Sequence, residues 1–286
     1  MEKVRQIAIC GGDQRQQFLA EALRRDGFSV WAWGLSGLPL AESIRQVPLE
    51  ELFWRCDCFI LPLPATVDGE TLFAPHSETV LSVKNGLAKQ LTGKTVFVGL
   101  PERLVKADPA WADVDCRDYS KQESFAVRNA FPTAEGALAI AIQESDRTIR
   151  GARCLVTGFG RIGQVLSRML RDLGADVTVA ARRTESLTWA ECLGYHPVSP
   201  EMLARDLNYD FIFNTIPAMV FSETLLRQMP SRCVAVELAS APWGFDFAAG
   251  KRLSKTIIKA PALPGRFSPR TAGEIIKDTI LTMMEE

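Results

Sequence analysis

One local pattern occurs twice along the chain, and it restricts the possible folds more than any other feature. Residues 7–33 align with residues 154–180 without a gap, and Gly11 falls on Gly158. Each copy has an apolar run, a glycine turn, apolar residues at i, i+3 and i+4 spacing, a glycine that can end a helix, and a second apolar run. Two such copies predict two doubly wound α/β units in one chain. Because any strand–helix–strand unit has this layout, the match is evidence of a shared architecture only and leaves common ancestry open.

Further short apolar runs continue the alternation of strands and helices along the sequence. The candidate strands are residues 6–10, 28–33, 57–61, 94–99, 114–118, 153–157, 176–180, 210–214, 233–238 and 256–259, with His196 expected on one more. Strands that are apolar throughout are typical of parallel sheets that helices cover on both faces. The predicted fold class is therefore α/β, with two doubly wound parallel-sheet domains of the Rossmann or flavodoxin type joined by long helices.

Two segments are expected to connect these domains. Residues 132–146 are apolar on nearly every face of a helix, and Pro132 suits the first helical turn. The chain is expected to cross back near residues 261–265, and a final helical pattern to pack on the first domain. The predicted segments are a first domain at residues 1–130, a second domain at residues 131–267, and a C-terminal helix at residues 268–286 that belongs to the first.

Composition excludes several classes of protein. The 33 Lys and Arg residues nearly balance the 34 Asp and Glu residues, which argues against a strongly basic nucleic-acid binder. No apolar run is long enough for a membrane span, and the N-terminus lacks the apolar core of a signal peptide. Most of the 7 cysteines lie in apolar runs without metal-ligand spacing. We therefore expect a soluble intracellular protein that holds no metal and does not bind nucleic acid or membranes.

The second copy of the pattern carries a phosphate-binding signature. Residues 158–163 fit the sequence GxGxxG between an apolar run and a helical pattern. Gly158 permits the tight turn, Gly160 lets the backbone approach a pyrophosphate, and Gly163 lets the helix pack against the strand. The helix N-terminus offers free N–H groups to the phosphates. A dinucleotide site is predicted, with contacts from Gly158, Phe159, Gly160, Arg161, Ile162 and Gly163; the alternative is a glycine-rich turn without a ligand.

The end of the next predicted strand distinguishes between the two nicotinamide dinucleotides. NAD-binding units usually place Asp or Glu there to hold the ribose 2′-hydroxyl, but this chain has Arg182, Arg183 and Thr184. Arginine can pair with a 2′-phosphate that a carboxylate would repel. NADP is therefore the predicted cofactor, and residues 131–267 are the predicted NADP-binding Rossmann domain. Alternatively, both arginines are solvated surface charges.

Two polar segments follow strands that would lie beside the glycine loop. Residues 214–217 come directly after an apolar run, and residues 237–240 occupy the same place one strand later. The carboxyl ends of these strands are where the ribose and nicotinamide half of the cofactor would lie. Roles in turns and caps are the alternative. The predicted cofactor contacts are Asn214, Thr215, Ile216, Pro217 and Ser240.

The first copy departs from the signature at two positions. Asp13 stands where the second copy has Gly160, and Gln16 stands where it has Gly163. A carboxylate there would repel a pyrophosphate, so a small anionic substrate is the better candidate for this helix N-terminus. In the alternative interpretation, Asp13 is a helix N-cap and Arg15 is a surface residue. The predicted substrate contacts in this loop are Gly12, Asp13 and Arg15.

Further polar groups lie in turns that are rich in glycine or proline. Arg128 and Arg266 have guanidinium groups suited to bidentate contacts with substrate carboxylates, and salt bridging between the domains is an equally good interpretation. Residues 1–130 are accordingly predicted to form the substrate domain. The predicted further substrate contacts are Arg128, Asn129, Thr133, Gly265 and Arg266.

Several of these motifs together resemble one family, the A subunits of dipicolinate synthase from spore-forming bacteria. The motifs are GGDxRQ at residues 11–16, NxxPTxEG at 129–136, GxGRxG at 158–163, NTIP at 214–217, LASxPxGxDF at 238–247, LPG at 263–265 and TAG at 271–273. The resemblance covers essentially the full length. It implies a fold similar to 2-hydroxyacid dehydrogenases and alanine dehydrogenase. It also implies an NADP-linked role in sporulation, in the cytoplasm of the mother cell, together with the flavoprotein-like B subunit of the synthase.

The implied reaction is oxidation of a dihydro- or hydroxytetrahydro-dipicolinate, a small dicarboxylate, to dipicolinate. Aromaticity of the product drives the hydride transfer, so modest base catalysis is sufficient, and Asp13 and Glu135 are the candidate bases. The His of hydroxyacid dehydrogenases has no counterpart here. Two alternatives remain: a dehydrogenase of another small 2-oxo or amino acid, and a non-catalytic NADP-binding subunit. We expect a homo-oligomer.

Overall fold

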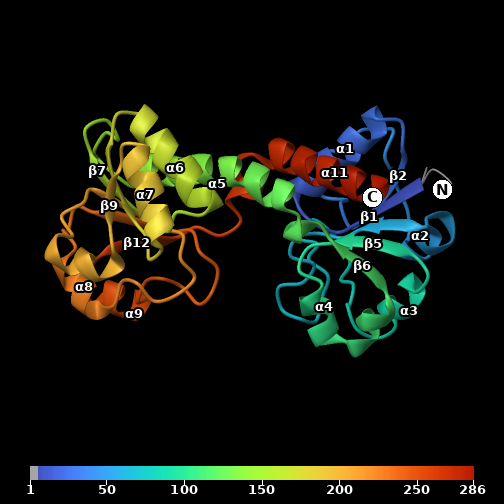
Figure 1. The fold of residues 1–286 in the computed structure, drawn as a ribbon. Coiled ribbons are helices and arrows are strands. Elements are labelled where there is room, and N and C mark those ends of the chain that lie inside the picture. The colour runs from blue at the N-terminus through green and yellow to red at the C-terminus, as the bar shows by residue number, and fades with distance from the viewer. Residues whose placement is uncertain (1–5) are drawn as a thin grey trace. The chain divides into compact units, whose positions relative to one another are not determined.

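The computed structural model describes residues 6–286, which divide into two compact units (Figure 1). Unit 1 contains the residues up to Asn129 together with Ser268–Glu286, and unit 2 is Ala130–Phe267. Each unit contains one six-stranded sheet whose paired strands all run parallel. Helices alternate with these strands along the sequence. The predicted α/β fold class is therefore confirmed.

In unit 1 the order of the strands reverses at the middle of the sheet. The strands are β1 (Gln6–Cys10), β2 (Ser29–Trp33), β3 (Arg45–Gln46), β4 (Cys58–Ile60), β5 (Thr95–Val98) and β6 (Asp115–Asp118). The helices are α1 (Gln14–Arg25), α2 (Leu49–Arg55), α3 (Leu87–Leu91), α4 (Glu102–Ala107) and α11 (Pro269–Glu285), with 3-10 turns η1 (Pro109–Asp113) and η2 (Tyr119–Lys121). The strand order is β3-β2-β1-β4-β5-β6, so the reversal lies between β1 and β4. Doubly wound sheets bind ligands at the carboxyl ends of the strands beside such a reversal.

Unit 2 repeats this topology. Its strands are β7 (Arg153–Thr157), β8 (Asp176–Ala180), β9 (His196–Val198), β10 (Phe211–Asn214), β11 (Val234–Glu237) and β12 (Thr256–Lys259). Its helices are α6 (Arg161–Asp172), α7 (Thr184–Cys192), α8 (Glu223–Gln228), α9 (Phe247–Arg252) and α10 (Leu263–Phe267), with the 3-10 turn η3 (Pro200–Arg205); α5 (Glu123–Gln143) begins in unit 1 and continues into unit 2. The strand order is β12-β11-β10-β7-β8-β9, and the reversal lies between β7 and β10.

The internal repeat of the sequence is reproduced element by element. The bounds of β1, α1 and β2 fall on the residues that align with the bounds of β7, α6 and β8. Every strand predicted from an apolar run is present, and His196 begins β9 as predicted. Strand β3 was not predicted because its two residues, Arg45 and Gln46, are polar and exposed and so form no apolar run. The repeat therefore places two equivalent glycine turns at equivalent sheet positions.

Helix α5 differs from the predicted connecting helix. It begins at Glu123, so Pro132 lies inside it and not in its first turn. The additional N-terminal turns include Phe125, which is buried and meets the ring of Tyr119 edge to face at 5.7 Å between centroids. This packing extends the helix in front of the proline, whose missing N–H removes only one backbone hydrogen bond. The predicted start was wrong because the proline rule uses local sequence alone.

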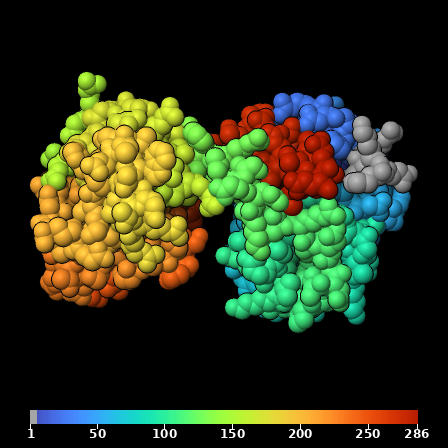
Figure 2. All heavy atoms as spheres, viewed as in Figure 1, coloured from blue at the N-terminus to red at the C-terminus, as the bar shows by residue number. Residues whose placement is uncertain are grey.

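Helix α11 packs on α1 within unit 1, as the red and blue elements of Figures 1 and 2 show. At Gly273 the two helices approach so closely that a Cβ atom would lie 2.4 Å from the carbonyl oxygen of Arg15 and 2.9 Å from the backbone nitrogen of Leu19. Lys277 of α11 also pairs with Asp26 beyond the end of α1, at 2.6 Å. The C-terminal helix thus holds the first turns of α1, where the candidate site of unit 1 lies.

The buried residues form separate cores on the faces of the two sheets. The 7 cysteines are all free, and most are buried among apolar neighbours, as predicted from their positions in apolar runs. Burial raises the pKa of Cys56 to about 11, so this thiol stays protonated at neutral pH. Among residues 6–286, none of the helices combines the length and the apolar character that a membrane crossing requires.

Candidate functional site

In unit 2, two glycines of the predicted phosphate loop are required by close approaches of the backbone. Gly158 has a φ of +93°, and a Cβ atom there would lie 2.2 Å from Oγ1 of Thr215. A Cβ atom on Gly163 would lie 2.1 Å from the carbonyl oxygen of Gly158. A side chain at either position would therefore separate α6 from β7 and from the loop that follows β10.

Gly160 has a different environment from its two neighbours. It is the N-cap of α6, it is exposed, and its backbone is extended with φ −83° and ψ −163°. A Cβ atom there would meet nothing within 4 Å. The space above the first turn of a twelve-residue helix is therefore open, next to backbone N–H groups that lack partners within the helix. This geometry fits a nucleotide pyrophosphate, which accepts hydrogen bonds from such groups.

The other predicted cofactor residues lie around this loop. Arg161 is exposed and Ile162 is half-buried in the first turn of α6, while Phe159 is buried and packs edge to face on Tyr195 at 6.1 Å between centroids. After β8, Arg182, Arg183 and Thr184 are all exposed. No carboxylate occurs among them, and Arg183 is the N-cap of α7. The end of β8 that would face the ribose of a bound nucleotide thus carries two exposed arginines, and the first carboxylate after them is Glu185 in the first turn of α7.

A buried polar chain joins the carboxyl ends of β7, β10 and β11. Thr157 donates its hydroxyl to Oδ1 of Asn214 at 2.5 Å, and Nδ2 of Asn214 donates to Oε1 of Glu237 at 2.7 Å. All three side chains are almost inaccessible to solvent. Asn214 is therefore enclosed by protein partners, whereas Thr215 and Ile216 are half-buried and Pro217 and Ser240 are exposed.

In unit 1, Asp13 is the N-cap of α1. Its carboxylate accepts the backbone N–H of Arg15 at 3.0 Å, and the side chain of Gln16 accepts the backbone N–H of Asp13 at 3.1 Å. This capping box satisfies N–H groups of the first turn that would otherwise be free for a ligand. The interpretation of Asp13 as an N-cap therefore holds, and the companion interpretation of Arg15 as a surface residue does not.

Arg15 is buried beneath this loop, with 7% of its surface exposed. Its Nε and Nη2 atoms donate to the two carboxylate oxygens of Asp13, each at 2.9 Å, and Nη2 also donates to the carbonyl oxygen of Leu63 at 2.8 Å. Leu63 follows β4, so Arg15 joins the two loops at the reversal of the sheet. Tyr119 donates its hydroxyl to the neighbouring carbonyl of Leu61 at 3.2 Å, and burial raises its pKa.

The glycine loop of unit 1 is covered by a distant segment of the chain. The backbone N–H of Gly12 donates to the carbonyl oxygen of Phe73 at 2.7 Å. Gly11 has a φ of +68°, and a Cβ atom there would lie 2.9 Å from the same oxygen. Above Gly12, the side chain of Gln16 occupies the space that a Cβ atom would need. Gly11 and Gly12 are consequently buried, in contrast to the exposed Gly160.

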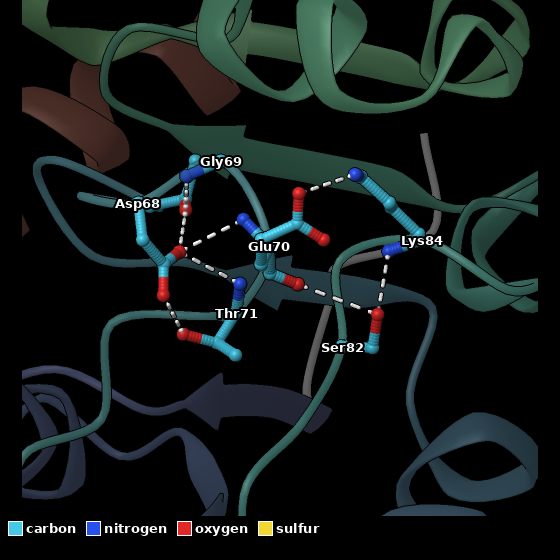
Figure 3. A network of polar contacts seen from close by, with 7 residues as sticks. Asp68, Gly69, Glu70, Thr71, Ser82 and Lys84 are labelled. Atoms are coloured by element: carbon cyan, nitrogen blue, oxygen red, sulfur yellow. Dashed lines mark hydrogen bonds and ion pairs between the residues drawn. The ribbon is translucent and has the colours of Figure 1, made fainter.

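Side-chain hydrogen bonds also close the loop that follows β4 (Figure 3). Asp68 accepts the backbone N–H groups of Glu70 and Thr71, each at 2.8 Å, and the hydroxyl of Thr71 at 2.7 Å. These bonds hold the pKa of Asp68 well below its usual range. Lys84 pairs with Glu70 at 2.6 Å and joins this loop to the following segment. A sequence pattern rich in Thr, Asp and Gly indicates such a turn, but not its partners.

The remaining predicted substrate residues are distributed over both units. In unit 1, Arg128 is exposed and pairs with Asp278 of α11 at 3.3 Å. Asn129, the last residue of that segment of unit 1, is half-buried. In unit 2, Thr133 is buried and Glu135 exposed on α5, while Gly265 and Arg266 lie on α10, with the Arg266 guanidinium 5.4 Å from the ring centroid of Phe267. Within residues 6–286, no three His, Cys, Asp or Glu side chains are grouped to hold a metal ion.

Sequence reasoning missed the partners of several site residues. The contacts of Arg15 with Leu63 and of Gly12 with Phe73 join segments that are far apart in the chain. The position of Glu237 at the end of an apolar run predicts that it lies near the cofactor site. Its complete enclosure could not be predicted, because the donors come from loops whose paths depend on tertiary structure.

The comparisons with known proteins agree with the resemblance found in the sequence. Residues 6–113 match the family model for the N-terminal domain of the dipicolinate synthase A subunit. The chain is 29% identical to the A subunit of dipicolinate synthase from Bacillus subtilis (strain 168), over 98% of this chain and 96% of that protein. The predicted resemblance is thus confirmed.

Solved structures show the same likeness in three dimensions. The crystal structure of the dipicolinate synthase A subunit from Bacillus halodurans is similar with a TM-score of 0.89 and 28% identity, covering 99% of this chain and 98% of that one. A transhydrogenase from Sinorhizobium meliloti shares the fold with a TM-score of 0.72 and 16% identity, covering 97% of this chain and 93% of that one.

Proposed function

We propose that this chain, which resembles the A subunit of dipicolinate synthase along nearly its whole length, is an NADP-dependent oxidoreductase that forms dipicolinate during sporulation. Its substrate is a dihydro- or hydroxytetrahydro-dipicolinate. With the flavoprotein-like B subunit of the synthase as its partner, it acts in the cytoplasm of the mother cell, where it forms a homo-oligomer. The observation that carries this proposal is the open helix N-terminus at Gly160, near a strand end where Arg182 and Arg183 precede the first carboxylate, Glu185.

The residues around α6 support unit 2 as the nucleotide site. Residues 158–163 offer backbone N–H groups to the pyrophosphate, and the open space at Gly160 allows its approach. Arg182 and Arg183 favour a 2′-phosphate over a free 2′-hydroxyl, because their guanidinium groups form charge-assisted hydrogen bonds with phosphate oxygens. Thr215, Ile216, Pro217 and Ser240 are the candidates for contacts with the nicotinamide half.

The acidic substrate is assigned to the loops at the strand reversal of unit 1. Arg15 carries the cation there, and its Nη1 atom has N–H groups beyond those that Asp13 and Leu63 accept. In the proposed complex a substrate carboxylate bonds these Nη1 groups while Asp13 stays in place, which requires the buried guanidinium to become accessible. Arg128 and Arg266 remain candidates for the second carboxylate, because both are exposed.

The reaction balances as a two-electron oxidation. When bound, NADP⁺ accepts a hydride at C4 of its nicotinamide. The dihydropyridine ring loses that hydride and one proton, which gives aromatic dipicolinate; a hydroxytetrahydro substrate also loses water. The residues of this chain have to orient the ring and receive a proton. Asp13 and Glu135 are the candidate bases, and Glu135 is the more accessible of the two.

A spectrophotometric assay of the purified chain tests this function. The chain is given dihydrodipicolinate and NADP⁺, and formation of NADPH is followed by its absorbance, with pyruvate-like acids as comparison substrates. The proposal predicts NADPH formation with dihydrodipicolinate. Activity confined to the comparison acids would instead show a dehydrogenase of another small 2-oxo or amino acid.

One observation favours a second candidate, a nucleotide-binding subunit whose partner performs the chemistry. Both carboxylate oxygens of Asp13 accept hydrogen bonds from Arg15, so this side chain is committed to an internal ion pair. If the chain binds NADPH but turns over only when a partner with an intact active site is added, the second candidate is correct. Turnover by the chain alone excludes it.

A further inference from the structure

Glu237 is a buried carboxylate at the cofactor edge of unit 2. It ends β11, and 1% of its surface is exposed. Nδ2 of Asn214 at 2.7 Å and the backbone of Ala239 at 3.0 Å donate to Oε1, and the backbone of Gly244 at 2.7 Å donates to Oε2. The backbone N–H of Phe245 also bonds the carboxylate. No Lys or Arg pairs with it among residues 6–286. The carboxylate is therefore stabilised by hydrogen bonds and not by an opposite charge.

This arrangement requires a group that only accepts hydrogen bonds. Both oxygens of a carboxylate accept hydrogen bonds. The side chain of Gln has an NH2 group in place of one oxygen, and this group would point at an N–H donor of the neighbouring loop. The packing is also tight, because a Cβ atom on Gly244 would lie 2.1 Å from Nδ2 of Asn214. Asn214, Gly244 and the carboxylate therefore hold one another in a single arrangement.

The same contacts fix two loops of the candidate site. Ala239 and Gly244 belong to the loop after β11, which also contains Ser240. Asn214 bonds both the N–H and the carbonyl group of Ile216, at 3.2 and 2.9 Å, and so holds the loop after β10.

These loops are also joined to the glycine loop. The hydroxyl of Thr215 donates to the carbonyl oxygen of Thr157 at 2.8 Å, and its Oγ1 lies 2.2 Å from the position that a Cβ of Gly158 would take. The side chain of Thr157 in turn donates to Asn214. The loops after β7, β10 and β11 thus share one buried network.

Stability alone does not account for a carboxylate at this position. Burial raises the pKa of Glu237, and the hydrogen bonds oppose that rise only in part. An acidic group whose pKa is raised in the folded state destabilises the fold when it is ionised at neutral pH. What the carboxylate does provide is a fixed geometry, because its hydrogen bonds hold Asn214 and the loop after β11 in place.

We infer that Glu237 is a positioning residue of the nucleotide site, which sets the loops after β10 and β11 so that they receive the nicotinamide half of the dinucleotide. The inference rests on the proposed function, because it takes these loops as cofactor contacts. It adds a residue that acts through Asn214 and the loop backbone without itself contacting the cofactor.

The test compares binding of NADPH with binding of adenosine 2′,5′-bisphosphate, which lacks the nicotinamide half. In Glu237→Gln, the Kd for NADPH rises about tenfold, as expected for loss of an oriented contact loop, while the Kd for the bisphosphate changes less than about twofold. Gly244→Ala, which displaces Asn214 by a different route, shows the same separation. Both ligands are titrated by calorimetry, and Tm is measured for each variant.

Asp210→Asn is the matched control. Asp210 is a largely enclosed carboxylate just before β10, at the amino ends of the strands of the same sheet. It accepts the backbone N–H of Arg153 at 3.0 Å and the Nε–H of Arg232 at 2.9 Å. The control lowers Tm without changing the Kd for NADPH.

Two results would overturn the inference while the proposed function stands. They are an unchanged Kd for NADPH in both site variants, or an equal rise for both ligands, which indicates general loosening. If the unmodified chain binds neither ligand, the proposed function fails and the inference fails with it. If Glu237→Gln does not fold, Gly244→Ala decides between these results.

Discussion

The glycine turns after β1 and after β7 begin alike and end differently. Both follow the central strand of a parallel sheet, and both lead into a helix of the same length. In unit 2 the N-cap is Gly160, which is exposed and has no neighbour within 4 Å of its Cβ position. In unit 1 the N-cap is Asp13, whose carboxylate is bonded to Arg15, and Phe73 covers the turn.

The difference shows that the strand–turn–helix frame does not by itself determine the ligand. The helix N-terminus attracts anions in both units. Side chains of unit 1 already use the donors of that terminus, and a cation is buried beneath it. Unit 2 leaves the donors open and provides cations at the neighbouring strand end instead. The open turn of unit 2 is therefore the one that we propose for the nucleotide, and the closed turn of unit 1 the one that we propose for a smaller acid.

The largest effect is expected when the second turn is given the N-cap of the first. Gly160→Asp places a carboxylate where the pyrophosphate would lie, so the Kd for NADPH should rise at least about 100-fold, or about 2.8 kcal/mol. Tm should not fall, because Asp is a favourable N-cap and the position has open space. Calorimetric titration and a thermal melt measure the two quantities. An unchanged Kd would mean that the nucleotide does not approach this turn.

A second prediction removes the cation of unit 1. Arg15→Ala should lower the free energy of unfolding by about 2 kcal/mol, because Asp13 loses both side-chain partners and the carbonyl of Leu63 loses its donor. The KM for the dicarboxylate should rise while the Kd for NADPH stays the same. Urea unfolding and steady-state kinetics check these outcomes, and a weakened affinity for NADPH would show that the first turn has been assigned wrongly.

The third prediction concerns the strand end that has cations in place of a carboxylate. Arg182→Asp should raise the Kd for NADPH about tenfold by removing a charge-assisted bond to the 2′-phosphate, and should leave the Kd for NADH nearly unchanged. Arg168→Asp, at an exposed position in the middle of α6, is the control and should alter neither Kd. Equal losses for both nucleotides would show that Arg182 does not recognise the phosphate.

The smallest effect is expected at the closed loop after β4 in unit 1. Because the pKa of Asp68 is lowered in the folded protein, its contribution to stability is present above the unfolded pKa of about 4 and is lost as the pH falls through the lowered value. Asp68→Asn should therefore lower Tm slightly at pH 7, and the difference from the unmodified chain should narrow toward pH 3. A constant difference over this range would mean that the ionised carboxylate is not what closes the loop.

Much of the fold could be predicted because local sequence patterns determine most of its strands and helices. The apolar runs, the paired glycine turns and the gap-free internal match indicate strands, helices and two wound sheets. Strand β3 has no apolar run, and the start of α5 depends on the contact of Phe125 with Tyr119, so neither was predicted correctly. Local rules fail where a distant contact determines the outcome.

The candidate site shows the same division. Residues 158–163 could be predicted as a phosphate loop because each glycine position requires a residue without a side chain. The structure shows this requirement directly at Gly158 and Gly163, where a Cβ atom would collide with a neighbouring atom. The enclosure of Asn214 by Thr157 and Glu237 could not be seen, because its partners end other strands. Arg15 was expected near a substrate, but its burial against Leu63 depends on the loop after β4.

Titration of NADPH into the unmodified chain, Arg15→Ala and Gly160→Asp tests the central assignment most directly. We expect one NADPH bound per unmodified chain, the same affinity in Arg15→Ala, and loss of binding in Gly160→Asp with the fold intact. Absence of NADPH binding by the folded unmodified chain would contradict it, and so would a site that survives in Gly160→Asp but is lost in Arg15→Ala.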